Sequence, residues 1–354
     1  MDQHSLGASF ANRARPASRF GANISFLDLV QGIGLLAVIL LGCLVMTVAS
    51  PVFATTRNLE NVLQSATIIA VVAIGQTFVI LVAGIDLSVA SVLVLSSVLS
   101  VGLVEFNGWS PGLAILAALG TGALFGLANG LAVTKLRIPA LIATLATMSI
   151  GRGLAYIFSG GQNIAPVPDI FVDLQDARIL GVPAVIVLTL ALAAIAQFVL
   201  SRTRFGRSVY ATGGNALAAR LAGIRTDRVI IATYVISGLM AGIAGLLITA
   251  RFEAGAATAA QGMELAVIAA VVIGGVSLFG GEGNMGGMLL GVLLLGLVQN
   301  AVNLLDVPPN YDSVVSGLVI AAAAALDVYR RSYLEAGLRR RVIAAKEAKA
   351  EKPK

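Results

Sequence analysis

The segment TGGNALAARLAGI, residues Thr212–Ile224, lies between two long apolar runs and differs from both of them. It combines two glycines and an asparagine with a short stretch of alanines and leucines that contains one arginine. Asn215 is a favourable N-cap, residues 216–222 favour a helix, and Gly223 is a typical helix stop. The segment therefore predicts a short, partly polar helix within a very apolar chain.

The chain around this segment has the composition of a membrane protein. Of its 354 residues, 58% are hydrophobic and 12% are charged, whereas soluble proteins have about 25% charged residues. Apolar runs of about 20 residues, the length that crosses a bilayer, alternate with short charged clusters. All should be helices, because lipid offers no partner to an open strand edge. We expect an all-α membrane protein, a polytopic bundle of about ten transmembrane helices, at residues 33–52, 65–85, 87–106, 111–134, 138–158, 182–200, 228–250, 264–280, 286–305 and 311–328.

The predicted organisation is one transmembrane domain with polar ends. Residues 1–32 form a polar leader, residues 33–328 the transmembrane domain, and residues 329–354 a basic tail. The first apolar run is longer than the core of a typical signal peptide, so we expect an uncleaved first helix.

The distribution of basic residues predicts the orientation. If both termini are cytoplasmic, the inner segments hold twenty of the 24 lysine and arginine residues: three in the leader, two at 135–137, six in the loop 201–227 and its border at Arg228, and nine after Tyr329. This satisfies the positive-inside rule. The net charge of +6 is then explained by contact with anionic membrane lipid, and we expect no nucleic-acid partner.

Several kinds of chemistry are missing from the sequence. The single cysteine, Cys43, lies in an apolar run, and the single histidine, His4, lies in the leader. No GxxxxGK[ST] motif occurs, so the chain has no phosphate-binding loop of that type. Residues 281–286 match GxGxxG, but two apolar runs flank them where a dinucleotide site needs a strand before the motif. We therefore expect no catalytic, cofactor-binding or metal site in this chain.

Polar side chains inside the apolar runs are candidates for a translocation path or for the interior of the bundle. Asp86, in GIDLS, could contact a solute or cap the helix that follows Gly84. Arg152 is the only basic residue deep in a run and needs a partner there. The other candidates are neutral amides, which suit a sugar or polyol better than an ion: Gln76, Asn129, Asn300 and Asn303.

Four segments of this chain resemble one protein family. They are RTRFGRSVYATGGNALAARLAGI, ILVAGIDLSVASVLVLSS, IPALIATLATMSIGRGLAYIFSGG and the stretch from ELAVIAAVVIGG to LVQNAVNLL. They are similar to the membrane permease subunits of bacterial ATP-binding cassette (ABC) importers for ribose and related monosaccharides. The resemblance covers roughly residues 60–328, in the same order.

The resemblance implies a function and partners. It implies a homodimeric permease in the bacterial inner membrane, served by a periplasmic solute-binding protein and driven by a separate ATPase subunit that binds ATP and Mg. It identifies the short helix with the cytoplasmic coupling helix that docks on the ATPase. The residues carried over to that role are Gly213, Gly214, Asn215, Ala218, Ala219, Leu221, Gly223 and Ile224. Ala222 stands where many members have serine.

Two other classes of function remain open. An ion-coupled secondary transporter of a small polar solute would need a buried acidic or histidine relay, for which the sequence offers only Asp86. A membrane enzyme is less favoured, because paired catalytic acids, a buried histidine and metal motifs are missing.

Overall fold

The structure is a computed structural model that describes residues 26–305 and residues 314, 317 and 318. Most of the expected leader, most of the expected span 311–328 and the tail 329–354 lie outside the described residues.

The described chain is almost entirely helical. The helices are α1 (Phe26–Ala49), α2 (Thr56–Leu81), α3 (Val89–Glu105), α4 (Pro111–Thr134), α5 (Ala140–Ser159), α6 (Asp169–Asp176), α7 (Ala184–Arg202), α8 (Arg204–Gly214), α9 (Ala216–Leu221), α10 (Thr226–Phe252), α11 (Met263–Ile273) and α12 (Met285–Leu304). The short strands β1 (Arg178–Ile179) and β2 (Val182–Pro183) form an antiparallel pair.

Six of these helices are long and apolar enough to cross a membrane: α2, α4, α5, α7, α10 and α12. Shorter apolar helices occur at residues 33–49 of α1, in α3 and in α11. This supports an all-α membrane protein, but the expected number of about ten spans is not confirmed. α11 has 11 residues, a length of about 16 Å, so it is too short for the span predicted at 264–280.

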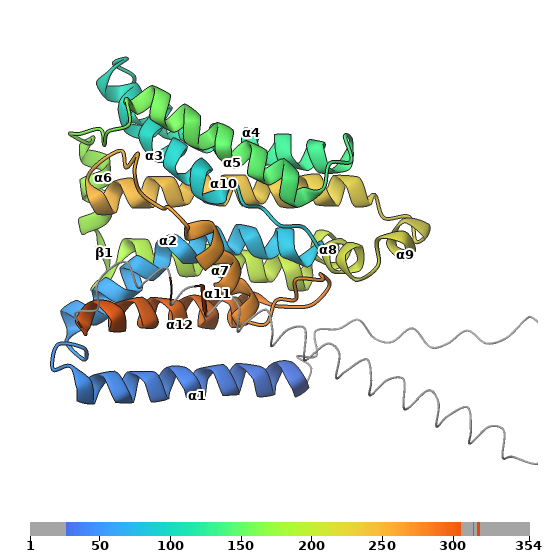
Figure 1. Cartoon of the computed structure of the whole chain (residues 1–354), viewed down its shortest axis with the longest axis horizontal. Helices are drawn as coiled ribbons and strands as arrows, with labels where there is room; N and C mark the ends of the chain where they lie inside the picture. Colours follow the sequence, from blue (N-terminus) through green and yellow to red (C-terminus); the bar gives the residue numbers. More distant parts are fainter. Residues whose placement is uncertain (1–25, 306–313, 315–316, 319–354) are drawn as a thin grey trace, which may run out of the picture.

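The long helices run roughly side by side, the short elements α6, β1, α8 and α9 lie at the two ends of the bundle, and the short helix α11 lies in its middle (Figure 1). We call the end that carries α8 and α9 the α9 end, and the end that carries α6 and β1 the α6 end. α1 packs along α12 at one side. It begins at Phe26, before the apolar run expected from residue 33.

The centre of the bundle is α2. Every residue from Ala66 to Leu81 is buried, which is the pattern of a helix surrounded by other helices. The helix starts nine residues before the apolar run predicted at 65, because the Thr55 side chain accepts a hydrogen bond from the Asn58 amide and caps it. It ends at Leu81, four residues before the end of the span predicted at 65–85, because Ala83 (φ 61°) leaves the helical conformation just before Gly84.

A glycine stripe joins α4 and α10 at backbone distance. A Cβ atom added at Gly126 would collide with the carbonyl of Tyr234, and one at Gly122 would collide with the carbonyl of Gly238. Small residues at this spacing let two helix backbones approach closely. α4 and α10 therefore form one tightly packed pair.

The α6 end carries an ion pair that the sequence did not suggest. The Arg178 guanidinium in β1 binds the Glu60 carboxylate of α2 through two hydrogen bonds of 3.1 and 3.0 Å. These bonds raise the pKa of Arg178 above its ordinary value. The pair attaches the short strands to the central helix.

Candidate functional site

The segment from Thr203 to Ile224 folds as two short helices at the α9 end. The Thr203 side chain caps α8, and Asn215 Oδ1 accepts a 2.9 Å hydrogen bond from the Ala218 amide to cap α9. Gly223, with φ 83°, ends the second helix. The short helix, its N-cap and its stop were all predicted from the sequence, and the structure confirms them.

The two faces of α9 differ sharply in exposure. Leu217 and Leu221 are 70% and 83% exposed, whereas Ala219 is only 4% exposed. Ala218 and Ala222 are also exposed. The small face expected from Ala218, Ala219 and Ala222 is therefore divided, because Ala219 packs against the chain itself. The outward face carries two exposed leucines, a feature of surfaces that bind a partner or lipid.

Gly213 attaches α8 to the rest of the bundle. A Cβ atom at this position would collide with the carbonyl of Leu81 at the end of α2. The Gly281 amide donates a 2.9 Å hydrogen bond to that same carbonyl. Gly213 is therefore a packing residue between α2 and the loop that precedes α12, whereas Gly214 has open space where a Cβ would be.

The GxGxxG match at residues 281–286 is part of that loop. Its first four residues form the interhelical connection after α11, its last two residues are the first two of α12, and no strand directly precedes it. Asn284 Oδ1 caps α12 by accepting a 2.8 Å hydrogen bond from the Gly287 amide. The Tyr210 hydroxyl of α8 donates a 2.7 Å hydrogen bond to the Gly283 carbonyl. The glycines thus serve a turn that packs on α8.

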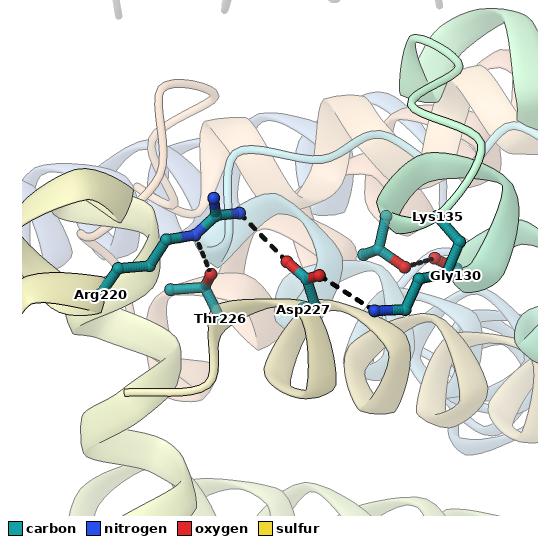
Figure 2. Close-up of polar contacts among 6 residues, drawn as sticks. Gly130, Lys135, Arg220, Thr226 and Asp227 are labelled. Atoms are coloured by element: carbon teal, nitrogen blue, oxygen red, sulfur yellow. Dashed lines mark hydrogen bonds and ion pairs between the residues drawn. The ribbon is translucent and has the colours of Figure 1, made fainter. Parts of the chain in front are cut away.

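A charged cluster connects α9 with the pair formed by α4 and α10. The Arg220 guanidinium of α9 donates a 2.7 Å hydrogen bond to Thr226 Oγ1 and lies 3.0 Å from Asp227 Oδ1, at the start of α10 (Figure 2). From the other side, Lys135 Nζ lies 3.2 Å from Asp227 Oδ2 (Figure 2). Lys135 directly follows α4. The Asp227 carboxylate thus pairs with one basic side chain from α9 and with another at the end of α4.

A cavity of about 280 Å³ opens beside this cluster. Its lining residues are Val133, Thr134, Arg137, Arg220, Asp227 and Ile230. The cavity is shared by α4, α9 and α10, so any movement of α9 relative to the bundle changes its shape.

Asp86 is the centre of a second, fully buried polar cluster. Its Oδ1 accepts hydrogen bonds from the Ser88 amide and hydroxyl, at 3.0 and 2.6 Å. Its Oδ2 accepts one from the Ser237 hydroxyl of α10, at 2.9 Å. The predicted capping of the next helix by Asp86 is wrong, because the N-cap of α3 is Ser88, which makes no side-chain cap bond, and among the described residues at the start of α3 Asp86 bonds only Ser88 itself.

Two further predicted residues belong to the Asp86 cluster. The Gln76 side-chain amide bonds the backbone of Asp86 in both directions, at 3.1 and 3.2 Å. Asn129 donates a 2.9 Å hydrogen bond to the Ser88 hydroxyl and accepts one of 2.7 Å from Thr147. Asp86, Gln76 and Asn129 are all buried. The hydrogen bonds of this cluster hold neighbouring helices together.

The remaining predicted residues lie elsewhere. Asn300 pairs with Asn58 of α2 through two amide hydrogen bonds of 3.1 and 2.8 Å. Asn303 is exposed on α12. Arg152 of α5 is half-buried and donates a 3.1 Å hydrogen bond to the Ala259 carbonyl, so it has a partner as predicted.

Five residues of these clusters were not predicted from the sequence as site residues: the hydroxyl residues Ser88, Ser237 and Thr147 and the charged residues Lys135 and Asp227. Hydroxyls within apolar helices usually bond their own backbone, so their sequence positions carry no signal. Asp227 could have been noticed, because it is the only acidic residue among the basic ones of the loop 201–227.

The sequence profile of a family described as "branched-chain amino acid transport system / permease component" matches residues 58–324. The ribose import permease protein of Escherichia coli K12 is 40% identical over 305 residues, which cover 84% of this chain and 94% of that protein. That of Haemophilus influenzae is 37% identical over 289 residues, which cover 80% and 89% of the two chains. An L-arabinose ABC transporter permease protein of Azospirillum brasilense is 38% identical over 302 residues, covering 85% and 88%. No solved structure shows significant similarity to the chain.

Proposed function

Because this chain belongs to the family of branched-chain amino acid transport system permease components, we propose that it is the membrane-spanning permease of an ABC importer for a monosaccharide. The relatives at 37–40% identity carry the names of ribose and arabinose permeases. The aldopentoses D-ribose and L-arabinose are therefore the first solutes to test. The permease provides the path through the membrane and performs no reaction itself.

The α9 end is the cytoplasmic end in this proposal. Eight basic residues of the described chain lie at or next to it, in the α4–α5 connection and between α7 and α10: Lys135, Arg137, Arg202, Arg204, Arg207, Arg220, Arg225 and Arg228. Only three lie at the α6 end: Arg57, Arg178 and Arg251. The positive-inside rule supports this orientation, which makes both termini of the chain cytoplasmic.

The observation that carries the proposal is the outward face of α9. Its six-residue helix is capped at Asn215, ended at Gly223 and held to α10 through Arg220, yet it exposes Leu217 and Leu221. We assign this face to the groove of a separate ATPase subunit, which binds ATP and Mg. Docked there, α9 transmits the closure of the ATPase to α10 and α4, and the permease alternates between inward-open and outward-open states.

The complete importer contains further components. We propose that two copies of this chain enclose the solute path, and that a periplasmic solute-binding protein delivers the sugar at the α6 end. The alternative of an ion-coupled transporter gains no support from Asp86, because both of its carboxylate oxygens are already bonded within the protein.

Uptake of radiolabelled D-ribose and L-arabinose by cells that express the complete transport system tests the proposal. We expect uptake of at least one sugar to stop when ATP is depleted and to persist when a protonophore collapses the proton gradient. Uptake that follows the ion gradient and ignores ATP would contradict the proposal.

Copurification with the ATPase subunit tests the docking face. Leu221→Glu should abolish copurification, because a charge would be buried in an apolar contact. Leu180→Glu is the matched control, since Leu180 is also fully exposed but lies at the α6 end. Equal copurification of both variants would remove α9 from the coupling role.

A further inference from the structure

The connection between α10 and α11 enters the bundle. α10 ends at Phe252 at the α6 end, and the chain then runs into the middle of the bundle, where α11 begins at Met263 (orange in Figure 1). We call residues 253–262 the re-entrant segment. It contains no helix, and its backbone forms only one isolated bridge, to Ile164. Non-helical backbone at membrane depth is stable only where it is buried in protein or lines a water-filled cavity.

The first half of the re-entrant segment is buried in protein. Gly255 exchanges two backbone hydrogen bonds with Ile164, of 3.0 and 2.8 Å. The Ala256 amide donates a 3.0 Å hydrogen bond to the Ser97 hydroxyl of α3, which lies 2.7 Å from the Thr249 hydroxyl. Ala256 and Ala257 are buried. The first half of the re-entrant segment is therefore fixed to Ile164 and to α3.

The second half is built differently. Thr258 and Gln261 are exposed, and within the described residues their carbonyl groups accept no hydrogen bond. Between them, the Ala259 carbonyl accepts the 3.1 Å hydrogen bond from Arg152 Nη1 of α5. A guanidinium has five N–H donors, and in the described chain only this one is used. Arg152 and the segment thus present both free donors and free acceptors.

Glu264 adds an acceptor in the first turn of α11. Its Oε2 atom is shielded from solvent, and among the described residues it has no hydrogen-bond partner. A buried polar atom without a partner is rare and costly, and such an atom often marks a site that a ligand or water completes. Glu264 follows Ala259, whose carbonyl Arg152 binds, by five positions in the sequence.

We propose that Arg152, Glu264 and the second half of the re-entrant segment form the site that the sugar contacts on its way through the membrane. This inference rests on the proposed function. Each hydroxyl of a sugar donates one hydrogen bond and accepts others. The carboxylate and the free carbonyls accept from these hydroxyls, and the guanidinium donates to them. A site of this kind, where non-helical backbone enters the bundle and a short helix begins in mid-membrane, matches the general construction of transporter binding sites.

Protection from alkylation tests the location of the site. Cys43 is the only cysteine, so Cys43→Ala provides a background without thiols, into which Thr258→Cys is introduced. Asp173→Cys, exposed on α6, is the control at the same end. In cells with the complete importer, a saturating concentration of the transported pentose should slow maleimide labelling of position 258 several-fold. Labelling of position 173 should not change.

Substitutions test the assigned contacts. Arg152→Ala and Glu264→Gln should each lower uptake about tenfold, the effect of one charge-assisted hydrogen bond. They should also change the ratio of D-ribose to L-arabinose uptake, because the two sugars place their hydroxyls differently. Arg152→Lys should restore part of the rate. Arg57→Ala and Glu253→Gln are the controls, since both side chains are exposed.

The outcomes separate this inference from the proposed function. If uptake is ATP-dependent but position 258 is unprotected and the sugar ratio is unchanged, the site is wrong and the function stands. If Arg152→Ala and Glu264→Gln lower the uptake of both sugars equally and also lower the thermal stability of the protein, the two residues are structural and the site is wrong. Uptake by the wild-type importer that follows the ion gradient and ignores ATP overturns the proposed function itself.

Discussion

Arg220 of α9 and Asp227 of α10 lie 3.0 Å apart, and the same carboxylate holds Lys135 at 3.2 Å (Figure 2). Asp227 therefore lies where α9 meets the pair of α4 and α10, whose backbones touch along the glycine stripe. A push on α9 reaches α10 directly through this contact. Thr226, which accepts from Arg220 at 2.7 Å, adds a second connection in the same turn.

Arg220→Ala should impair transport while leaving the fold and the ATPase contact intact. The ion pair is exposed, and exposed pairs contribute only about 0.2–1 kcal/mol to stability. Uptake per ATP hydrolysed should fall severalfold, because α9 would no longer pull on α10. The measurement compares uptake and ATP hydrolysis in proteoliposomes, with Arg207→Ala, an exposed arginine of α8, as the control. Unchanged coupling in Arg220→Ala would show that the contact is only a surface pair.

Ala218→Trp should prevent copurification with the ATPase while the permease remains inserted. A well-fitted contact tolerates added volume poorly, at a cost of about 1–3 kcal/mol. A helix that merely lay on lipid would accept tryptophan, which is favoured at membrane interfaces. Ala218 is the informative position, because Ala219 is buried against the chain itself. Ala219→Trp should therefore disturb α9 itself, and normal ATPase binding by Ala218→Trp would argue for a lipid-surface helix.

Asp86→Ala should destabilise the protein more than any exposed acidic substitution. It leaves the Ser88 and Ser237 hydroxyls without their acceptor in the interior, at a cost of about 1–3 kcal/mol for each unsatisfied group. Thermal unfolding in detergent measures the loss, with Asp173→Ala as the exposed control. Asp86→Asn should be milder, because the amide oxygen can still accept one of the bonds. Equal melting temperatures for Asp86→Ala and Asp173→Ala would show that the hydrogen bonds of Asp86 do not hold the helices together.

Gly126→Ala should disrupt the contact between α4 and α10, whereas Gly120→Ala should not. The added methyl group at Gly126 collides with the Tyr234 carbonyl, but at Gly120 it meets nothing within 4 Å. Both glycines lie in α4, so the gain in helix propensity is the same for both variants. We expect a lower melting temperature and less inserted protein for Gly126→Ala alone. Equal behaviour of the two variants would contradict the close contact.

Local features of the chain could be predicted from the sequence because they depend on neighbouring residues. The apolar runs indicated where most membrane helices lie, since length and hydropathy decide which segments suit lipid. Asn215 and Gly223 marked the ends of the short helix, and GIDLS marked the break after α2.

The tertiary structure alone decided which residues meet. Ser237 lies 151 residues from Asp86 and Ser97 lies 159 from Ala256, and no periodic pattern relates such positions. The apolar sequence after Ile273 predicted a longer α11, but the turn at Gly274 and Gly275 ends it. The faces of α9, the hydrogen-bonded carboxylate of Asp86 and the shielded Glu264 Oε2, which has no partner among the described residues, also follow from packing between helices distant in sequence. Apolar composition selects helices for the membrane, whereas contacts between those helices determine which polar groups are satisfied and which remain open to a solute.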